Sequence, residues 1–443
     1  MSTIETSSSF RPGQSVWLEI AEERCEIQEL IGSGGQGEVY RVLLHEEEYA
    51  LKWYFQRHAS KEQREGIERL VHKGSPNDRF LWPLDLALCQ GVPSFGYLMP
   101  IREPRYRPMA DLMNRAVDPT FRTLTTVALQ LADSFLELHS HGLCYSDISF
   151  GNIFLDPDTG EISICDNDNV AVDGEGRSGV LGTPRFMAPE IVAGSAWPTI
   201  QTDLYSLAVI LFYTLMVHHP LEGRRETEID CLDLDAMQKL YGKEALFIFD
   251  PEDESNRPVP GIHDNALLFW NFYPRYLSQT FTRAFTAGLR DPGARVRESE
   301  WRTVFTRMLD QIFYCPHCES ENFLCDEGDL PGAYPEHACW SCHKKLIPPL
   351  RLRIGHQTVV LNQDTILYPH HLDPNRRNNY SEMLAEVAPH PKRPDVWGLK
   401  NLSQDVWTSL PVAGGSVKVP HDRSVSLVPG LRIQFGHSEG VVL

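Results

Sequence analysis

The sequence predicts a multidomain chain: an α+β unit with a small sheet and a larger helical body, then a small metal-binding module, then an all-β sandwich. Short strand-like runs dominate about residues 16–100, and long helical periodicities dominate about residues 108–310. Five of the ten cysteines crowd into residues 315–342. Short strand candidates separated by Gly, Pro, Asn and Asp fill residues 350–443, as in a sandwich or barrel.

Composition narrows the range of partners and compartments. The 443 residues carry a formal net charge of −19, and such an acidic surface repels nucleic acid and anionic lipid. The first residues, MSTIETSSSFRPGQS, lack the basic start and apolar run of a secretory signal. The longest apolar stretch, residues 204–217, is short for a bilayer and typical of a buried helix. We expect a cytoplasmic protein without a membrane span.

The N-terminal elements follow from composition and periodicity. Residues 1–15 are rich in Ser and Thr and are expected to form a flexible lead. The runs VWLEI, EVYRVLL and EYALKWYF predict strands, and a helical pattern covers residues 60–73. In the helical body, FRTLTTVALQLADSFLELHSHG predicts a long helix that closes near Gly142.

A glycine-rich segment, IGSGGQGEVYRV at 31–42, lies between two predicted strands. Its glycines are Gly32, Gly34 and Gly37, and Val39 follows. Glycines at this spacing let backbone N–H groups approach triphosphate oxygens, and the valine can cover an adenine ring. A glycine-rich hairpin without a ligand is the alternative interpretation of this segment alone.

The next predicted strand supplies a cation. Lys52 lies 15 residues after Gly37 in YALKWY, and Ala50 is a small residue beside which adenine can lie. Together the glycine-rich segment and this lysine resemble the N-lobe of a protein kinase. In that family a helix glutamate pairs with the lysine. The helix at 60–73 offers Glu65 and Glu68, and we favour Glu68 because it lies closer to the buried face.

A second set of residues fits phosphoryl transfer, which needs a carboxylate to orient the acceptor hydroxyl and metal ions held against the phosphates. In HGLCYSDISFGNIFL, Asp147 fits the carboxylate and Asn152 fits a Mg²⁺ ligand. After a hairpin, EISICD delivers Asp166 as the main Mg²⁺ ligand. The order and spacing resemble the kinase catalytic loop and metal-binding aspartate.

Several neighbouring positions depart from the kinase pattern. His-Arg-Asp is replaced by YSD, with Ser146 in place of the arginine, Ser149 stands where a lysine is common, and Asp-Phe-Gly has become DND at 166–168. The family's arginine pairs with a phosphorylated activation loop, so its loss predicts activity without phosphorylation of Ser178 or Thr183. The loss of the lysine predicts a slower rate.

Downstream strings support the same resemblance over about residues 16–310. GTPRFMAPE at 182–190 is similar to the end of an activation segment of Ser/Thr kinases. Asp203, at the start of the buried helix, is implied to brace the catalytic-loop backbone, and Arg295 is implied to pair with Glu190.

The resemblance implies a bilobed protein-kinase fold, with an N-lobe at about 16–100 and a C-lobe at about 101–312. It implies an ATP- and Mg²⁺-dependent enzyme that phosphorylates protein Ser/Thr hydroxyls. A nucleotide-binding pseudokinase that acts as a scaffold is the alternative.

The cysteine-rich segment predicts a zinc ribbon at residues 313–347. Its two CxxC pairs are Cys315 with Cys318 and Cys339 with Cys342. Two such turns form a closed tetrahedral site suited to a structural Zn²⁺ ion. Disulfides are the alternative, and Cys325, His317, His337 and His343 are possible substitute ligands.

Residues 350–443 are similar to a forkhead-associated domain through WGLKNLSQDVW and RSVSLVPGLRIQFG. The phosphothreonine-reading residues of that family are not evident, so packing or partner docking is the expected role. The whole arrangement resembles bacterial, eukaryotic-like Ser/Thr kinases of tellurite-resistance-type triads. This resemblance implies a PP2C-type phosphatase and a von Willebrand A-domain protein as partners.

Overall fold

The computed structural model describes residues 8–175, 181–325, 338–390 and 392–443. The chain divides into two compact units, each described by itself below. The first comprises residues 1–119, 130–263 and 282–298, and the second comprises residues 120–129, 264–281 and 299–443. Several helices that the sequence places in the helical body therefore belong with the cysteine-rich module and the β-rich tail.

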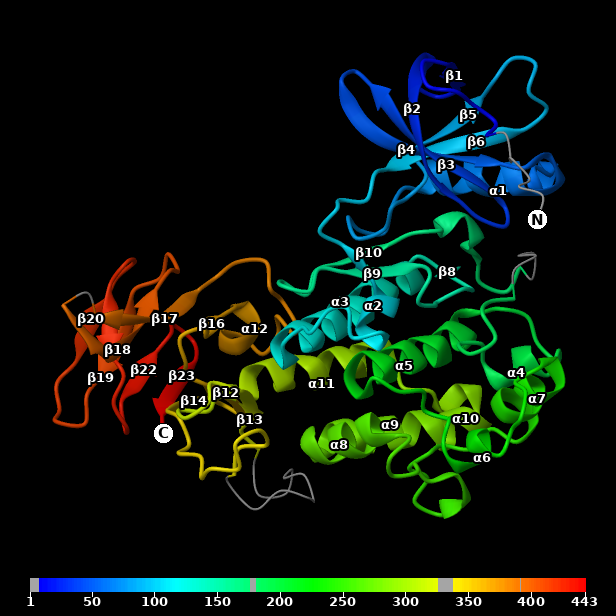
Figure 1. Cartoon of the computed structure of the whole chain (residues 1–443). Coiled ribbons are helices and arrows are strands. Elements are labelled where there is room, and N and C mark those ends of the chain that lie inside the picture. Colours follow the sequence, from blue (N-terminus) through cyan, green and yellow to red (C-terminus); the bar gives the residue numbers. More distant parts are fainter. Residues whose placement is uncertain (1–7, 176–180, 326–337, 391) are drawn as a thin grey trace. The chain divides into compact units, whose positions relative to one another are not determined.

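The first unit begins with a closed antiparallel barrel in the order β1-β2-β3-β4-β6-β5 (Figure 1). Its strands are β1 (Ser15–Leu18), β2 (Glu23–Ser33), β3 (Gly37–Leu44), β4 (Glu47–Tyr54), β5 (Asp85–Leu88) and β6 (Phe95–Pro100). Strand β1 closes the barrel because it pairs with both β2 and β5. Alternate residues such as Val16, Ile27 and Val42 are buried inside it.

The segment before β1 packs on the barrel. Phe10 is 3% exposed and makes edge-to-face contacts with Tyr40 and Trp53. The Ser9 and Phe10 backbone N–H groups donate to Glu38 and to the Tyr40 hydroxyl. The expected flexible lead is therefore wrong for residues 8–15, because an aromatic anchor holds the segment on the barrel. Residues 1–7 lie outside the described residues.

Helix α1 (Lys61–Lys73) follows the short 3-10 turn η1 (Gln56–His58) and agrees with the predicted helix. The Ser60 side chain caps it by accepting from the Gln63 N–H. Gly74, at φ 77°, ends it and donates to the Leu70 carbonyl. Ile67 and Leu70 form its buried face.

The helical part of the first unit is built around α5 (Ile200–Met216). A Thr199/Thr202 capping box starts this helix, and nearly every residue in it is buried. Helix α3 (Phe121–Ser140) contributes its residues from 130 onward and ends before Gly142, which has φ 68°. The remaining elements are β7 (Arg107–Pro108), α2 (Met109–Met113), β8 (Leu143–Cys144), β9 (Ile153–Leu155), β10 (Ile162–Ile164), η2 (Asn167–Asn169), β11 (Ala171–Val172), α4 (Pro189–Val192), α6 (Arg224–Thr227), α7 (Leu234–Gln238), η3 (Lys239–Lys243), η4 (Glu254–Asn256), α10 (Ala287–Arg290) and η5 (Pro292–Ala294).

The second unit contains helices, a small hairpin and two sheets. Its helices are the part of α3 before residue 130, α8 (Asp264–Phe272), most of α9 (Arg275–Phe285), most of α11 (Glu298–Gln311) and α12 (Pro369–Leu372). Its hairpin is β12 (Ile312–Tyr314) with β13 (Glu321–Phe323). Helix α12 packs near α11 through an ion pair of 3.0 Å between His371 and Asp310. The Tyr380 hydroxyl also bonds Thr306 on α11.

The C-terminal region forms the predicted β-sandwich. A six-stranded sheet has the order β15-β14-β23-β22-β19-β20, and a four-stranded sheet has the order β16-β17-β18-β21. Side chains from both sheets, among them Leu352, Leu399 and Trp407, share one apolar core. The strands are β14 (Arg351–Ile354), β15 (Gln357–Val360), β16 (Ile366–Leu367), β17 (Ala385–His390), β18 (Arg393–Asn401), β19 (Trp407–Leu410), β20 (Val417–Val419), β21 (Ser424–Ser426), β22 (Arg432–Gln434) and β23 (Glu439–Val442).

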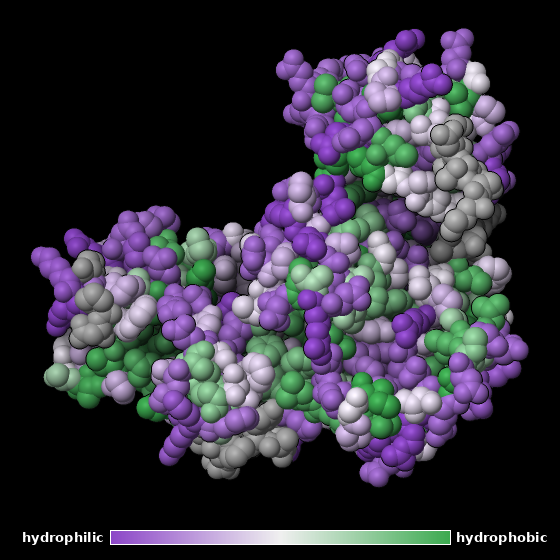
Figure 2. All heavy atoms as spheres, viewed as in Figure 1, coloured by the Kyte–Doolittle hydropathy of each residue, from purple (hydrophilic) through white to green (hydrophobic). Residues whose placement is uncertain are grey.

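Hydrophilic side chains cover most of the face drawn in Figure 2, as the charge of −19 leads one to expect. Among the described residues, none of the helices combines the length and apolar character needed to cross a membrane.

Candidate active site and cysteine cluster

The glycine-rich segment forms the turn between β2 and β3. The Gly34 N–H donates to the Gly37 carbonyl at 2.9 Å. A Cβ on Gly37 would lie 2.1 Å from the Trp53 carbonyl oxygen, so only glycine fits where β3 crosses β4. Val39 pairs with Lys52 across these strands, which places the hairpin directly beside the lysine.

Lys52 is buried and bonded to two carboxylates. Its Nζ lies 2.8 Å from Asp168 Oδ2 and 3.3 Å from Asp166 Oδ1. Burial lowers the pKa of the Lys52 ammonium, but the charges of Asp168 and Asp166 outweigh burial, and the net pKa is raised. The lysine is therefore charged and oriented toward the start of η2.

The helix glutamates do not hold this lysine. Glu68 is exposed, and Glu65 forms an exposed pair with Lys61 at 3.4 Å. The prediction that Glu68 pairs with Lys52 is therefore wrong for this structure, because the buried face of α1 at Ile67 carries Gln63 one turn earlier. Gln63 donates to the Tyr54 hydroxyl at 3.1 Å and to the Asp168 carbonyl at 3.3 Å.

Asp147 and Asn152 meet in the loop between β8 and β9. Asn152 Nδ2 donates to the Asp147 carbonyl at 2.8 Å and to Asp147 Oδ2 at 3.1 Å. The Thr183 hydroxyl donates to Asp147 Oδ1 at 2.9 Å. Both oxygens of the carboxylate therefore have fixed partners, which set its orientation.

Asp166 follows β10 and lies next to this loop. The Cys165 N–H donates to the Asn152 carbonyl at 2.9 Å, which ties the two segments together. Asp166 has a left-handed backbone at φ 53°, and its side chain is 45% exposed. Burial raises the pKa of its carboxyl, Lys52 lowers it and Asp168 raises it, and the net pKa lies above the ordinary value. A cation placed beside Asp166 would relieve that repulsion.

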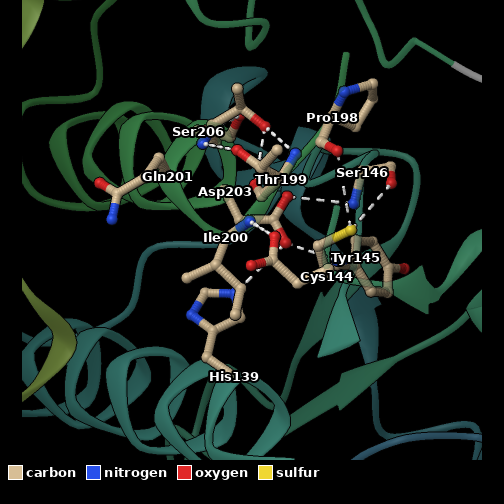
Figure 3. A network of polar contacts seen from close by, with 12 residues as sticks. His139, Cys144, Tyr145, Ser146, Pro198, Thr199, Ile200, Gln201, Asp203 and Ser206 are labelled. Carbon is tan, nitrogen blue, oxygen red and sulfur yellow. Dashed lines mark hydrogen bonds and ion pairs between the residues drawn. The ribbon is translucent and has the colours of Figure 1, made fainter. Parts of the chain in front are cut away.

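A buried network braces the backbone of the loop that carries Asp147 (Figure 3). Asp203, 1% exposed at the start of α5, accepts from the N–H groups of Tyr145 and Ser146. His139 bonds Asp203 through Nε2 and Glu298 through Nδ1. Ser146 has φ 72°, a costly conformation for a residue with a side chain, and Asp203 stabilises it. The predicted bracing role of Asp203 is confirmed.

The predicted ion pair between Arg295 and Glu190 is also present. The guanidinium of Arg295 lies 2.8 Å from Glu190 Oε2 and is almost fully buried. It also donates to the carbonyls of Gly288 and Gln201. This pair ties the start of α4 to η5 and to α5.

Comparison with known protein families identifies one part of the chain. Residues 96–282 match the protein kinase domain family. The chain contains a protein kinase domain. The match begins after Lys52, so the glycine-rich hairpin and the lysine lie outside it, whereas Asp147, Asn152 and Asp166 lie within it.

Relatives of this kinase domain include two bacterial serine/threonine-protein kinases and a yeast protein kinase. The DNA damage-responsive serine/threonine-protein kinase RqkA of Deinococcus radiodurans is 32% identical over 46% of this chain and 32% of its own length. The protein kinase gsk3 of Schizosaccharomyces pombe is 32% identical over 42% of this chain and 53% of its own length. The serine/threonine-protein kinase PknK of Mycobacterium tuberculosis is 28% identical over 46% of this chain and only 19% of its own length. The chain thus spans about half or less of the length of these relatives.

Outside the kinase domain match, the four predicted cysteines converge. The Sγ atoms of Cys315 and Cys342 are 3.7 Å apart, and those of Cys318 and Cys339 are 3.6 Å apart. A disulfide requires about 2.0 Å, whereas thiolates around one tetrahedral Zn²⁺ ion lie roughly 3.8 Å apart. The substitute ligands Cys325, His317 and His343 are not in this group, and His337 lies outside the described residues.

Three residues of the network around Lys52 were not predicted from the sequence. Asp168 and Tyr54 each lie two residues beyond a predicted residue, and Gln63 lies four residues before Ile67 on the same helix face. The alternation of side chains along β4 could have indicated Tyr54, and the helical period of α1 could have indicated Gln63. The kinase pattern has a glutamate on the helix and a glycine at the position of Asp168, so it favoured Glu68 instead.

Proposed function

We propose that the chain is a protein kinase that transfers the γ-phosphate of ATP to Ser or Thr hydroxyls of proteins. The observation that carries the proposal is the connected set of Lys52, Asp166, Asn152 and Asp147. Lys52 bonds Asp166, the Cys165 N–H reaches Asn152, and Asn152 bonds Asp147. Phosphoryl transfer needs these parts in proximity and little else from the protein.

In this proposal each residue has one task. Asp147 accepts the proton of the acceptor hydroxyl, and Thr183 and Asn152 hold its carboxylate in place. Lys52 donates to phosphate oxygens of ATP. Asn152 and Asp166 supply side-chain oxygens, the ligands that Mg²⁺ prefers, and they would hold that ion. Bound Mg²⁺ neutralises the charge on the phosphate groups.

The loop geometry supports activity without phosphorylation of the activation segment. Ser146 replaces the arginine that would pair with a phosphate, and Asp203 already holds its backbone N–H at 3.0 Å. The unmodified Thr183 hydroxyl is the donor to Asp147, so phosphorylation of Thr183 would remove this bond. Ser178 lies outside the described residues. A Ser178→Ala protein treated with phosphatase should keep the untreated wild-type rate, and a large loss would contradict this part of the proposal.

The test of the function is transfer of labelled phosphate from ATP to a generic protein acceptor, with and without Mg²⁺. Wild type should label Ser and Thr, as located by mass spectrometry, and Lys52→Ala should not. An exposed-site control, Asp78→Asn, should behave as wild type. Nucleotide binding without transfer in every protein would instead support the pseudokinase scaffold.

We further propose that the cysteine cluster holds one structural Zn²⁺ ion in a zinc ribbon. Four thiolates leave no open coordination position. Metal analysis of protein purified without chelators should find about one zinc per chain. A finding of no zinc would reject the site.

For the β-sandwich we propose a forkhead-associated-like docking module, with a PP2C-type phosphatase and a von Willebrand A-domain protein as candidate partners. Its two-sheet core supports the architecture alone. Free cysteines throughout the described chain fit a reducing, cytoplasmic compartment. Copurification of either partner with the full chain, but not with a chain ending at residue 349, tests the docking role.

A further inference from the structure

Asp168 is a buried carboxylate without a counterpart in the kinase pattern, which has glycine at this position. Its side chain has no exposed surface. Asp168 Oδ2 accepts from Lys52 Nζ at 2.8 Å and from the Tyr54 hydroxyl. An ionised carboxylate is costly to bury unless it is paired and hydrogen-bonded, and this one is both.

Two further residues fix the position of this carboxylate. Tyr54 lies two residues after Lys52 on β4, so both side chains project from the same face of the strand. Gln63 on α1 donates to the Tyr54 hydroxyl and to the Asp168 carbonyl, at 3.1 and 3.3 Å. The lysine is thus held by a chain of contacts in which helix α1 supplies only a neutral amide.

The two acidic residues of the DND triplet face different surroundings. Asp166 is 45% exposed and 3.3 Å from the lysine, whereas Asp168 is enclosed and closer to it. This difference leaves Asp166 accessible to a metal ion and assigns the tighter lysine contact to Asp168. On α1, Glu65 pairs with Lys61 at 3.4 Å, and Glu68 is exposed beside His72.

We propose that Asp168 is the residue that orients Lys52 toward the phosphates of ATP, in place of a helix glutamate, with Tyr54 and Gln63 as its supports. The inference rests on the proposed kinase function and names a positioning residue for it. Because the anchor belongs to η2 and not to α1, the lysine is held without a charged contact from that helix. Residues of α1 and η2, with Gln63, Gly66 and Asp168 among them, line a hollow of about 460 Å³ beside this ion pair.

A direct metal contact by Asp168 is the competing role. Asp168 Oδ1 is buried and has no hydrogen-bond partner among the described residues, so it is a possible ligand atom. The roles of lysine anchor and metal ligand predict different ways of restoring activity after Asp168 is replaced. A lost lysine anchor is restored by a carboxylate placed elsewhere in the network, whereas a lost metal ligand is compensated by a higher Mg²⁺ concentration.

The test compares Asp168→Asn, Gln63→Glu, the double variant and Glu68→Gln in the full chain, with kcat and KM for ATP measured at low and saturating Mg²⁺. Asp168→Asn should lower kcat/KM about 100-fold, the size expected when a reacting group is misplaced. The double variant, which returns a carboxylate to the network from α1, should regain at least about tenfold of that loss. Glu68→Gln should stay within about twofold of wild type.

Three results would overturn the assignment: wild-type kinetics in Asp168→Asn, rescue by Mg²⁺ and not by Gln63→Glu, or an equal loss in Glu68→Gln. Thermal unfolding of each variant separates misfolding from misplacement, and Asp168→Glu, which keeps the charge, should retain more activity than Asp168→Asn. If wild type transfers no phosphate, the proposed function fails separately. The same variants are then compared by the affinity of a fluorescent ATP analogue, where Asp168→Asn should weaken binding and Gln63→Glu should restore it.

Discussion

His139 links the catalytic loop to the end of the first unit and makes stability depend on pH. Both of its ring nitrogens face carboxylates, Nε2 toward Asp203 and Nδ1 toward Glu298, so both carry protons. All three side chains are buried. Burial lowers the pKa of His139, but the bonds and charges of Asp203 and Glu298 outweigh burial and raise it to about 9.

The size and sign of the effect follow from linkage. A histidine pKa raised from 6.5 to about 9 in the folded state corresponds to about 3 kcal/mol, at ~1.4 kcal/mol per tenfold change. Because the folded pKa is the higher one, this stabilisation is fully present below pH 6.5. It falls between pH 6.5 and 9 and is lost above pH 9.

Urea unfolding of wild type and His139→Gln at intervals from pH 6 to 9.5 tests this reasoning. Subtracting the two free energies of unfolding cancels the groups that titrate alike in both proteins. The variant should be about 3 kcal/mol less stable at pH 6, and the difference should shrink to less than ~1 kcal/mol at pH 9.5. A difference that stays constant across this range would refute the charged state of His139.

Three further predictions concern other parts of the chain. Arg295→Met removes a buried guanidinium and leaves Glu190, whose side chain is 23% exposed, without its partner. It should cost about 1.5–3 kcal/mol of stability, measured by urea unfolding, and a cost below ~1 kcal/mol would show that the pair contributes little. Gly37→Ala places a Cβ 2.1 Å from the Trp53 carbonyl oxygen, so it should raise KM for ATP and lower the melting temperature. Gly35 has open space around it, so the control Gly35→Ala should change KM and the melting temperature little. Removal of metal by a strong chelator should lower the melting temperature by at least ~5 °C, and a quadruple Cys→Ser variant should show no response to the chelator.

Much of the site could be predicted because short, local patterns encode it. The spacing from Asp147 to Asn152, the strand that ends before Asp166, and the two CxxC turns each fix residue types within a few positions. Helix α1 was likewise predicted closely, since its cap Ser60 and its terminating glycine are local signals.

The failed predictions depended on contacts between distant segments. Sequence alone does not show that Asp168 reaches across 116 residues to Lys52, so the family pattern led to Glu68. Helix phase alone would have placed Gln63, Ile67 and Leu70 on one face and left Glu68 outside it. The packing of Phe10 on Tyr40 and Trp53 was missed for the same reason, because its Ser-rich neighbours suggested a loose segment.

The proposed phosphoryl transfer is tested most sharply by Asp147→Asn, which keeps the shape of the side chain and removes its charge. Labelled ATP, saturating Mg²⁺ and a protein acceptor give kcat and KM, with Asp78→Asn as the control. If Asp147 acts on the acceptor hydroxyl, kcat should fall about 10²–10⁴-fold while KM for ATP stays nearly unchanged. Equal kcat in the Asp147→Asn protein and wild type would show that Asp147 has no such role.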